Sequence, residues 1–467
     1  MHKLWEKHTW RNQHFGKRIV QIQASPADRE VSIMLHAAYV AIVVIALLSV
    51  RFARRRAMGP CMVWLAGLIP AVCMIALLWH FSEPEKRFND YCKAYQPAAR
   101  ALLSDPAALR PLYKKVDYVN IPLVAVAYVP FARLSPRWTE VIYTLLGAIG
   151  IGLAYLLLSR MAALSAIGRL ALAGLFVANG PLFNSLREGN STHFVLLLLV
   201  LALVFQQQQR RFLGGALLAV AAWIKIPLAL FGAWFLLRRQ WRVLIGFGLA
   251  ALGIAILSIA LYGFDLHEYW FKRCIRPFLG RPLGAFNVQS VDGFAVRLLS
   301  AEHPWDWKPL TPDWPFHLLR YAMIGLLLSA VVLVTRRAQR PLSSAVATVE
   351  FCIVLCLSIL LSPISWSHYC LWLLLPAAYA LGPWRRVLES RAWHVMWLAG
   401  MGLSSLPITL LRPGHWILQE LNARLWVSHT FIGGLLILIV LLAVHARLAT
   451  GRTAEAPSRA ALRSVPA

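Results

Sequence analysis

The sequence predicts an all-α protein that crosses a membrane many times. Of its 467 residues, 59% are hydrophobic and only 14% are charged, and the mean hydropathy is +0.60. This composition excludes an ordinary soluble globular protein. Apolar runs of roughly 17 residues or more recur along most of the chain, and each can cross a hydrocarbon core about 30 Å thick. The runs lack the alternation of barrel strands, so the spanning elements are predicted to be helices.

The apolar runs predict eleven crossings. They lie at about 33–50, 60–81, 138–159, 165–185, 192–206, 241–263, 318–336, 348–364, 368–384, 391–411 and 427–446. Two shorter apolar segments, 121–134 and 212–237, are expected to dip into the membrane without a full pair of crossings. The domain boundaries that follow are a polar basic segment at 1–30, a membrane domain at 31–446, and a basic tail at 447–467 that is expected to be disordered.

The net charge of +27 comes from 47 Lys and Arg against 20 Asp and Glu. Much of this charge lies in short loops between apolar runs, as the positive-inside rule predicts, so the expected partners are anionic membrane lipids rather than nucleic acid. The rule predicts a multi-pass protein of the cytoplasmic membrane whose external segments include 82–120, 187–191, 264–317 and 364–368. The long segment 264–317 is expected to form an external, periplasmic loop region.

Asp90 is the first candidate for chemistry. It lies in Phe88-Asn89-Asp90-Tyr91, shortly after an apolar run ends, and precedes the amphipathic stretch 91–103. A carboxylate at the membrane surface could serve as a general base toward an acceptor hydroxyl. Alternatively, Asp90 could be the N-cap of the helix that starts at Tyr91.

Lys225 is the second candidate. The sequence Lys225-Ile226-Pro227 interrupts segment 212–237, because proline lacks an amide donor and breaks a helix. A lysine in an apolar segment is costly and suggests a function, here the binding of a phosphate by a point charge. The alternative is a lysine that snorkels or that pairs with Glu350.

Two polar interruptions are predicted at the outer face. His368, between two apolar runs, could relay a proton or donate to a leaving phosphate, or it could be a satisfied interfacial histidine. The turn Arg187-Glu188-Gly189-Asn190 could contact sugar hydroxyls or a phosphate, or it could be a polar turn only.

The external segment 264–317 also contains polar candidates, namely Asn287, Gln289 and Ser290. Its tryptophans suit either sugar stacking or an aromatic belt at the membrane surface. Cys92 and Cys274 both fall in predicted external segments, so a disulfide between them is possible.

Several motifs are absent. The sequence has no Walker loop, no dinucleotide-binding fingerprint, no HExxH and no paired spacing of metal ligands. No cofactor or metal is therefore expected. A nucleotide-sugar donor is disfavoured, and a lipid-anchored donor is favoured.

Taken together and in order, short motifs between about residues 60 and 384 resemble glycosyltransferase family 87, whose members have the GT-C membrane fold. The motifs are Phe88-Asn89-Asp90-Tyr91, Tyr118-Val119-Asn120-Ile121-Pro122, Glu188-Gly189-Asn190, Ala221-Ala222-Trp223-Ile224-Lys225-Ile226-Pro227, Asn287-Val288-Gln289-Ser290 and Ser362-Pro363-Ile364-Ser365-Trp366-Ser367-His368. The chain departs from the family at Glu188, where members often have Gln, at Ile121, where they often have Pro, and in an extra span at 33–50.

The resemblance implies that Asp90 is the catalytic carboxylate and that His368 lies in the same cavity. It implies a polyprenyl-phosphate sugar donor, mannose or a related sugar, and a lipid or glycan acceptor. Lys225 and Arg187 are then expected to bind the donor phosphate. The motifs also predict substrate binding by Asn89, Asn120, Glu188, Asn190, Asn287, Gln289, Ser290 and Trp366.

The function expected from these residues is an inverting glycosyl transfer on the outer face of the cytoplasmic membrane. The alternative is a transporter or flippase for an anionic lipid, with Lys225 in a translocation path. An enzyme requires Asp90 and His368 to converge on one pocket, whereas a carrier requires polar residues along a continuous path.

Overall fold

The computed structural model describes residues 87–300, 307–338, 342–388, 390–407 and 416–450. All regular elements of these residues are helices, and their one β feature is an isolated bridge between Val288 and Trp366. The predicted spans 33–50 and 60–81 and the N-terminal segment 1–30 lie outside the described residues. The all-α class predicted from the sequence is confirmed for the part of the chain that is described.

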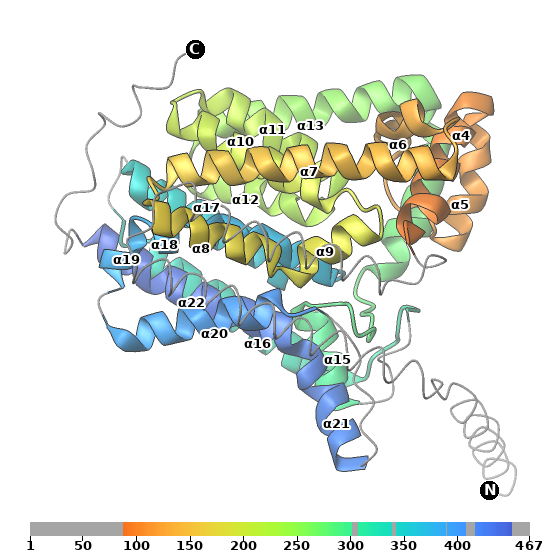
Figure 1. The fold of residues 1–467 in the computed structure, drawn as a ribbon. Coiled ribbons are helices and arrows are strands. Elements are labelled where there is room, and N and C mark those ends of the chain that lie inside the picture. The colour runs from red at the N-terminus through yellow and green to blue at the C-terminus, as the bar shows by residue number, and fades with distance from the viewer. Residues whose placement is uncertain (1–86, 301–306, 339–341, 389, 408–415, 451–467) are drawn as a thin grey trace, which may run out of the picture.

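The long helices run side by side along one direction (Figure 1). They are α7 (Pro136–Met161), α8 (Ala166–Val177), α10 (Thr192–Gln207), α11 (Arg211–Ile224), α13 (Trp241–Tyr262), α16 (Trp314–Thr335), α17 (Ser344–Leu360), α20 (Arg391–Ser405) and α22 (His429–Ala449). Because α22 continues to Ala449, the predicted disordered tail does not begin at Arg447; residues 451–467 lie outside the described part.

Four helical segments of the described chain are long and apolar enough to cross a membrane. They are Pro136–Met161, Trp241–Tyr262, Trp314–Thr335 and Gln419–Ala449. A bent pair, α8 with α9 (Gly180–Arg187), adds a fifth if it is one span broken by 50°. The protein is thus a polytopic membrane protein, and the count of eleven crossings stays a prediction.

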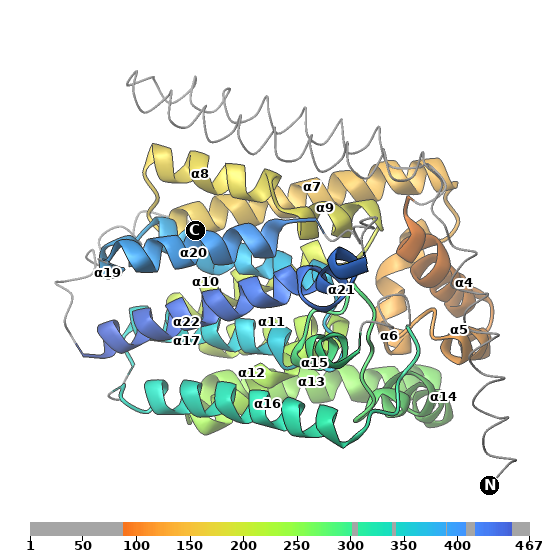
Figure 2. The same ribbon diagram turned by 90° about the horizontal axis from the view of Figure 1, so that it is seen from below.

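Short helices gather at one end of the bundle (Figures 1 and 2). This end is called the site end below. Its elements are η2 (Tyr91–Tyr95), α4 (Gln96–Ser104), η3 (Pro106–Ala108), α5 (Leu109–Lys115), α6 (Pro122–Ala125), η4 (Val126–Phe131), α14 (Phe264–Trp270), η6 (Phe271–Ile275) and η7 (Arg276–Phe278). A core of tyrosines joins them: the ring of Tyr95 stacks on Tyr128 with centroids 4.5 Å apart.

The predicted external loop 264–317 is largely helical, since it contains α14, η6, η7 and α15 (Val291–Leu299). The predicted span 368–384 is also interrupted. It consists of η8 (Ser367–Leu373), a 3-10 segment, followed by α18 (Leu374–Leu381) and α19 (Trp384–Val387). Two further short elements, α21 (Trp416–Arg424) and η9 (Trp426–Ser428), precede α22.

Segment 212–237 forms the interrupted hairpin that the sequence predicts. Helix α11 ends at Ile224, Lys225 is extended (φ −138°, ψ 92°), and the chain continues as η5 (Ile226–Ala229) and α12 (Leu230–Leu237). The start of α11 lies against the start of α13: a Cβ on Gly246 would meet the carbonyl oxygen of Phe212 at 2.1 Å. Because α13 begins just after α12 ends, both limbs of the hairpin return to the same side, with Lys225 near the apex.

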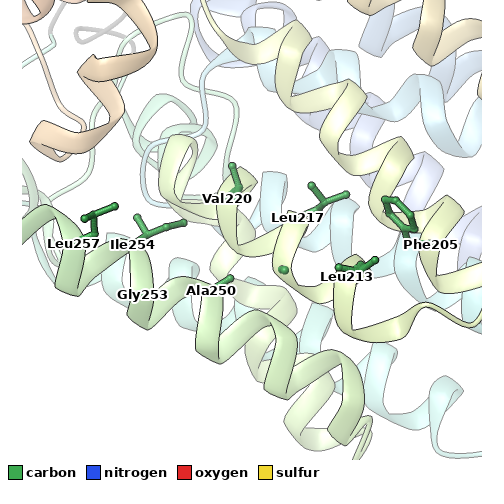
Figure 3. Close-up of a pocket in the computed structure, with 9 residues that line it drawn as sticks. Phe205, Leu213, Leu217, Val220, Ala250, Gly253, Ile254 and Leu257 are labelled. Atoms are coloured by element: carbon green, nitrogen blue, oxygen red, sulfur yellow. The ribbon is translucent and has the colours of Figure 1, made fainter.

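An apolar groove of about 440 Å³ runs along the outside of this hairpin (Figure 3). Side chains of α11 and α13 face one another across it, with Phe205 of α10 at one end. The lining residues are Phe205, Leu213, Ala216, Leu217, Val220, Ala250, Gly253, Ile254 and Leu257. Val220 is five residues before Lys225, about 7 Å along a helix.

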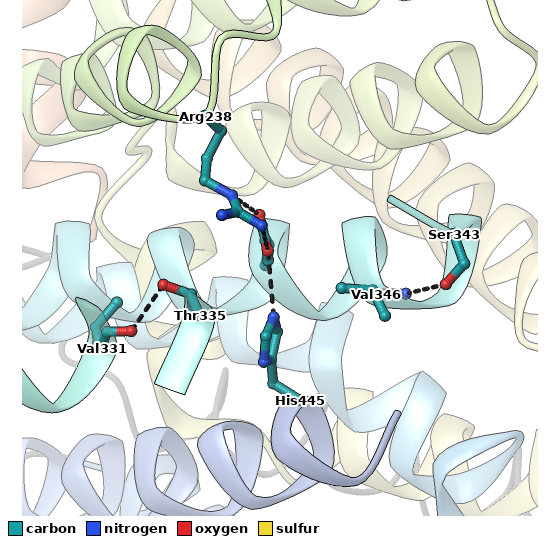
Figure 4. Close-up of polar contacts among 7 residues, drawn as sticks. Arg238, Val331, Thr335, Ser343, Val346 and His445 are labelled. Atoms are coloured by element: carbon teal, nitrogen blue, oxygen red, sulfur yellow. Dashed lines mark hydrogen bonds and ion pairs between the residues drawn. The ribbon is translucent and has the colours of Figure 1, made fainter. Parts of the chain in front are cut away.

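A buried ion cluster holds the end of the hairpin that lies away from Lys225 (Figure 4). The Arg238 guanidinium donates to both Glu350 oxygens, at 2.9 and 2.5 Å, and His445 Nε2 lies 3.2 Å from Glu350 Oε1. Glu350 is only 1% exposed. The proposed pairing of Lys225 with Glu350 is therefore wrong, because Arg238, at the C-cap of α12, already occupies that carboxylate.

The disulfide that the sequence allows between Cys92 and Cys274 does not form. Both thiols are free, Cys92 is exposed, and Cys274 is buried with its Sγ directed at the carbonyl of Tyr118, 3.5 Å away. Cys274 instead packs η6 against the α5 region.

Candidate active site

The turn at 187–190 positions Asp90. Backbone N–H groups of Asp90 and Tyr91 both donate to the carbonyl oxygen of Glu188, at 3.0 and 3.2 Å, and Phe88 N–H donates to Arg187 at 2.7 Å. Gly189 has φ +64°, and a Cβ there would meet the side chains of Phe88 and Tyr91 at 2.8 Å. The glycine thus permits the close approach that holds Asp90 against the turn.

Asp90 is not an N-cap. Its own backbone is helical (φ −64°, ψ −41°), and its side chain makes no capping hydrogen bond. The reason is that the Glu188 carbonyl already accepts from the first amides of the helix, which leaves the Asp90 carboxylate available for other contacts. The capping alternative for Asp90 is therefore wrong, whereas the predicted helix after residue 90 is confirmed.

Asn190 joins Asp90 to Lys225. Its Nδ2 donates to Asp90 Oδ2 at 2.6 Å, and its Oδ1 accepts from Lys225 Nζ at 3.1 Å. The same Oδ1 accepts from Thr192 Oγ1 at 2.6 Å. The lysine and threonine donors fix which side of the amide is the oxygen, so the amide nitrogen faces the carboxylate.

Lys225 is buried and its ammonium has no carboxylate within salt-bridge distance among the described residues. Besides the Asn190 oxygen, its contact is the Tyr369 ring, whose centroid lies 5.3 Å from Nζ. An amide oxygen and an aromatic face stabilise a cation less completely than an acid does. No carboxylate therefore contacts the Lys225 ammonium directly in the described part of the chain.

His368 lies on the same side of the bundle as this ammonium. It is 8% exposed, it packs edge-on against the neighbouring Tyr369, and it interacts electrostatically with Lys225. Its Nε2 is buried without a hydrogen-bond partner among the described residues. Lys225 therefore links the predicted candidates: it is bonded through Asn190 to Asp90 and interacts electrostatically with His368.

Burial and nearby charges have opposite effects on the pKa of Asp90. Burial raises the pKa of the Asp90 carboxyl, whereas the hydrogen bond from Asn190 and then the charges of Lys225, Arg187 and Lys93 lower it; burial prevails. A carboxyl with a raised pKa is a stronger base than one in water, and the cations still favour its ionised form.

Arg187 and Glu188 pair with each other. The guanidinium and the carboxylate of these neighbours are 2.5 Å apart, and both are partly exposed. Burial raises the pKa of Glu188, and Arg187 lowers it. Asn89 is half-buried beside Asp90, whereas Asn120 lies behind tyrosines, where its carbonyl accepts from Tyr113 Oη at 3.1 Å.

The loop 287–290 supports the start of η8. Gln289 N–H donates to Ser365 at 2.6 Å, Ser367 N–H donates to Asn287 at 2.8 Å, and Val288 bridges Trp366. The Gln289 side chain bonds to the backbone of Phe286, Val427 and Phe431. Ser290 caps α15, Asn287 Oδ1 accepts from Trp307 Nε1, and Trp366 is half-buried.

These contacts hold the segment that carries His368. A substrate-binding role for Asn287, Gln289, Ser290 and Trp366 stays a prediction.

Sequence reasoning missed Tyr369, Thr192 and Lys93, which lie near the charges described above. Tyr369 directly follows His368, and Thr192 stands two residues after Asn190, so the neighbouring motifs were the available signal. Lys93 stands one helical turn after Asp90. The described residues contain no group of three or more His, Cys, Asp or Glu that could hold a metal.

Comparison with known proteins places this site in context. The family model for glycosyltransferase family 87 matches residues 118–363. The chain is 27% identical over 430 residues to the polyprenol-phosphate-mannose-dependent alpha-(1-2)-phosphatidylinositol mannoside mannosyltransferase of Mycobacterium tuberculosis, covering 84% of this chain and 93% of that protein. It is 31% identical over 221 residues to the protein of the same name in Mycolicibacterium smegmatis, covering 45% and 46%. No solved structure matches.

Proposed function

The chain belongs to glycosyltransferase family 87 and is a membrane glycosyltransferase, and we propose that it transfers mannose from a polyprenyl phosphate to a hydroxyl of a glycolipid or glycan. The similar mycobacterial proteins are named as polyprenol-phosphate-mannose-dependent enzymes, which supports the choice of donor. The observation that carries the proposal for this chain is the link from Asp90 through Asn190 to Lys225.

In the proposed reaction the acceptor oxygen attacks the anomeric carbon from the face opposite the phosphate, so the configuration inverts. The bond between that carbon and the phosphate oxygen breaks, and its electron pair stays on the phosphate. The Asp90 carboxylate takes the proton of the acceptor hydroxyl. The products are the mannosylated acceptor and polyprenyl phosphate.

Lys225 supplies the charge that the leaving phosphate requires. Negative charge grows on the phosphate as the bond breaks, and a cation fixed there beforehand stabilises the transition state more than the ground state. Within the described residues the ammonium contacts the Asn190 oxygen and the Tyr369 ring but no carboxylate, and it interacts electrostatically with His368. We assign His368 Nε2 as a second donor to the phosphate, because that nitrogen has no other partner there.

The groove of Figure 3 is the proposed site of the polyprenyl chain. It is lined only by apolar side chains and Gly253, and its residue Val220 precedes Lys225 by about 7 Å of helix. A prenyl chain in this groove would bring its phosphate to the apex of the hairpin.

The outer face of the cytoplasmic membrane is the proposed location of the site. The support is the distribution of arginines: Arg210 and Arg211 start α11, and Arg238 and Arg239 follow α12, at the end of the hairpin away from Lys225. Cations collect on the cytoplasmic side of membrane helices. The site end would then face outward.

The test is a transfer assay with the purified protein. Radiolabelled polyprenyl-phosphate mannose is incubated with the protein and a lipid extract, and the products are separated and their anomeric configuration determined. A new mannolipid with inverted configuration is expected. Movement of the donor across a vesicle membrane without any product would contradict the enzyme and support the transporter alternative, and retained configuration would contradict the inverting mechanism.

A further inference from the structure

Two arginines from different segments share one aromatic ring at the site end. The guanidinium carbon of Arg110 lies 5.3 Å from the centroid of the Tyr269 ring, and that of Arg273 lies 5.5 Å from the same centroid. Both distances are within the range of a cation–π interaction. One ring therefore contacts two like charges that come from different segments.

The fold brings these arginines together from positions far apart in the sequence. Arg110 is on α5, and Arg273 is on η6, one helical turn after Tyr269. The Sγ of the buried Cys274 lies 3.9 Å from the carbonyl oxygen of Tyr113 on α5, and Trp270 Nε1 donates to the carbonyl of Val119, shortly after α5, at 2.8 Å. Packing thus fixes the backbones of the two segments, and the Tyr269 ring contacts both guanidiniums.

Neither guanidinium has an acid partner in the described part of the chain. The salt bridge closest in sequence joins Lys272 to Glu268, at 2.7 Å. The segments 109–115 and 264–278 contain six Lys and Arg, all exposed, and only two acids. Those six are Arg110, Lys114, Lys115, Lys272, Arg273 and Arg276, and the acids are Asp265 and Glu268, so the formal charge is +4.

The pair also lies where a membrane span ends. Helix α13 ends at Tyr262, seven residues before Tyr269. Beside it, Phe264 is 66% exposed and Phe271 is 45% exposed, as expected of side chains at the headgroup level. Phosphate groups of membrane lipids occupy this level.

We propose that Arg110 and Arg273, held by the Tyr269 ring, form a binding site for a phosphate ester, separate from the donor phosphate at Lys225. Two planar guanidiniums present paired N–H donors that match phosphate oxygens. A bound anion would also relieve the repulsion between the two cations. This site goes beyond the proposed transfer reaction, and its phosphate comes from a lipid headgroup or from free phosphate.

The experiment measures binding to the purified full chain in a neutral detergent by microscale thermophoresis. Three probes separate the sources: dihexanoyl phosphatidylglycerol, which is an anionic headgroup, dihexanoyl phosphatidylcholine, which has no net charge, and inorganic phosphate. The variants are R110Q/R273Q, Y269L, Y269F, and the control K114Q/K115Q, which removes two charges that do not contact the ring.

Saturable binding of phosphatidylglycerol is expected, weaker by about tenfold or more in R110Q/R273Q and reduced in Y269L. Y269F, which keeps the ring, and K114Q/K115Q should bind within about twofold of the unchanged protein. Equal binding of inorganic phosphate would support the site and assign it to free phosphate. Equal losses in K114Q/K115Q and R110Q/R273Q, or equal binding of phosphatidylcholine in all variants, would overturn the proposal.

Discussion

The two ends of the hairpin 211–237 carry opposite kinds of polar network. At the arginine end, Arg238, Glu350 and His445 form a closed set in which the acid is bonded by two side chains. At the apex, the Lys225 cation meets an amide oxygen and a ring but no acid. A network whose charges are paired neutralises them and holds helices together, whereas a network with an unpaired cation keeps that charge available for a ligand. One hairpin therefore carries a structural network at its arginine end and a candidate ligand site at its apex.

Among the substitutions that compare the two ends of the hairpin, replacing Lys225 with Gln should have the largest effect on activity. In the proposed reaction the ammonium is the main stabilisation of the leaving phosphate, so we expect its loss to lower kcat by about 10²–10³. The thermal midpoint should not decrease, because no buried acid is left unpaired. Activity is measured with labelled donor and stability by thermal unfolding in detergent; the control K93Q removes an exposed cation near Asp90. A large loss of stability in Lys225→Gln would place this residue with the structural network.

Replacing Glu350 with Gln should give the opposite pattern. It leaves the Arg238 guanidinium buried without a full partner, at an expected cost of about 3–5 kcal/mol in the free energy of unfolding. The double variant R238M/E350L should recover most of that loss. Transfer activity per folded molecule should change by less than about threefold, because the cluster lies about 20 Å of helix from Lys225. A variant that folds normally but is inactive would contradict the separation of the two ends.

A substitution of Asn190 tests the hydrogen-bonded link between Asp90 and Lys225. Asn190→Ala removes the hydrogen bond to Asp90 and the oxygen that faces Lys225, and kcat should fall by about 10–100-fold. The matched control is Asn184→Ala, a half-buried amide of α9 with no assigned role; little change is expected. Similar losses in both variants would remove Asn190 from its assigned role.

The pH dependence of activity has the smallest expected effect, and its direction is specific to Asp90. Burial raises the pKa of Asp90, and a base must be ionised. We therefore expect kcat/KM to rise with pH, in an acidic limb whose midpoint lies above the ordinary pKa of an aspartate. Lys93 lowers that pKa, so K93Q should move the limb to higher pH, by a few tenths of a pH unit. A limb that moves to lower pH in K93Q would assign it to another group.

The sequence was sufficient to identify Asp90, Lys225 and His368 as candidates, because polar residues in apolar surroundings are costly and therefore informative. It also predicted the break at Lys225 from Pro227. It could not identify the partner of Glu350, since Lys225 and Arg238 are both cations of one hairpin and only the fold decides which one reaches the acid.

The short helices in 264–299 were missed for a different reason. Helices of five to nine residues are stabilised by packing rather than by their own propensity. Here α14 and η6 pack against α5, whereas α15 packs against α16 and α21. The capping role considered for Asp90 failed because a backbone carbonyl from the distant turn at Glu188 already satisfies the helix amides. Such long-range partners are not visible in local sequence.

The most direct measurement is mannose transfer by Asp90→Asn beside Asp105→Asn. Asp105 is an exposed carboxylate on the same segment, whose side chain accepts from the amide of Ala107. We predict that Asp90→Asn folds and binds the donor but loses transfer by about 10³-fold or more, whereas Asp105→Asn remains nearly fully active. Full transfer by Asp90→Asn would contradict the account, because the base would then lie elsewhere.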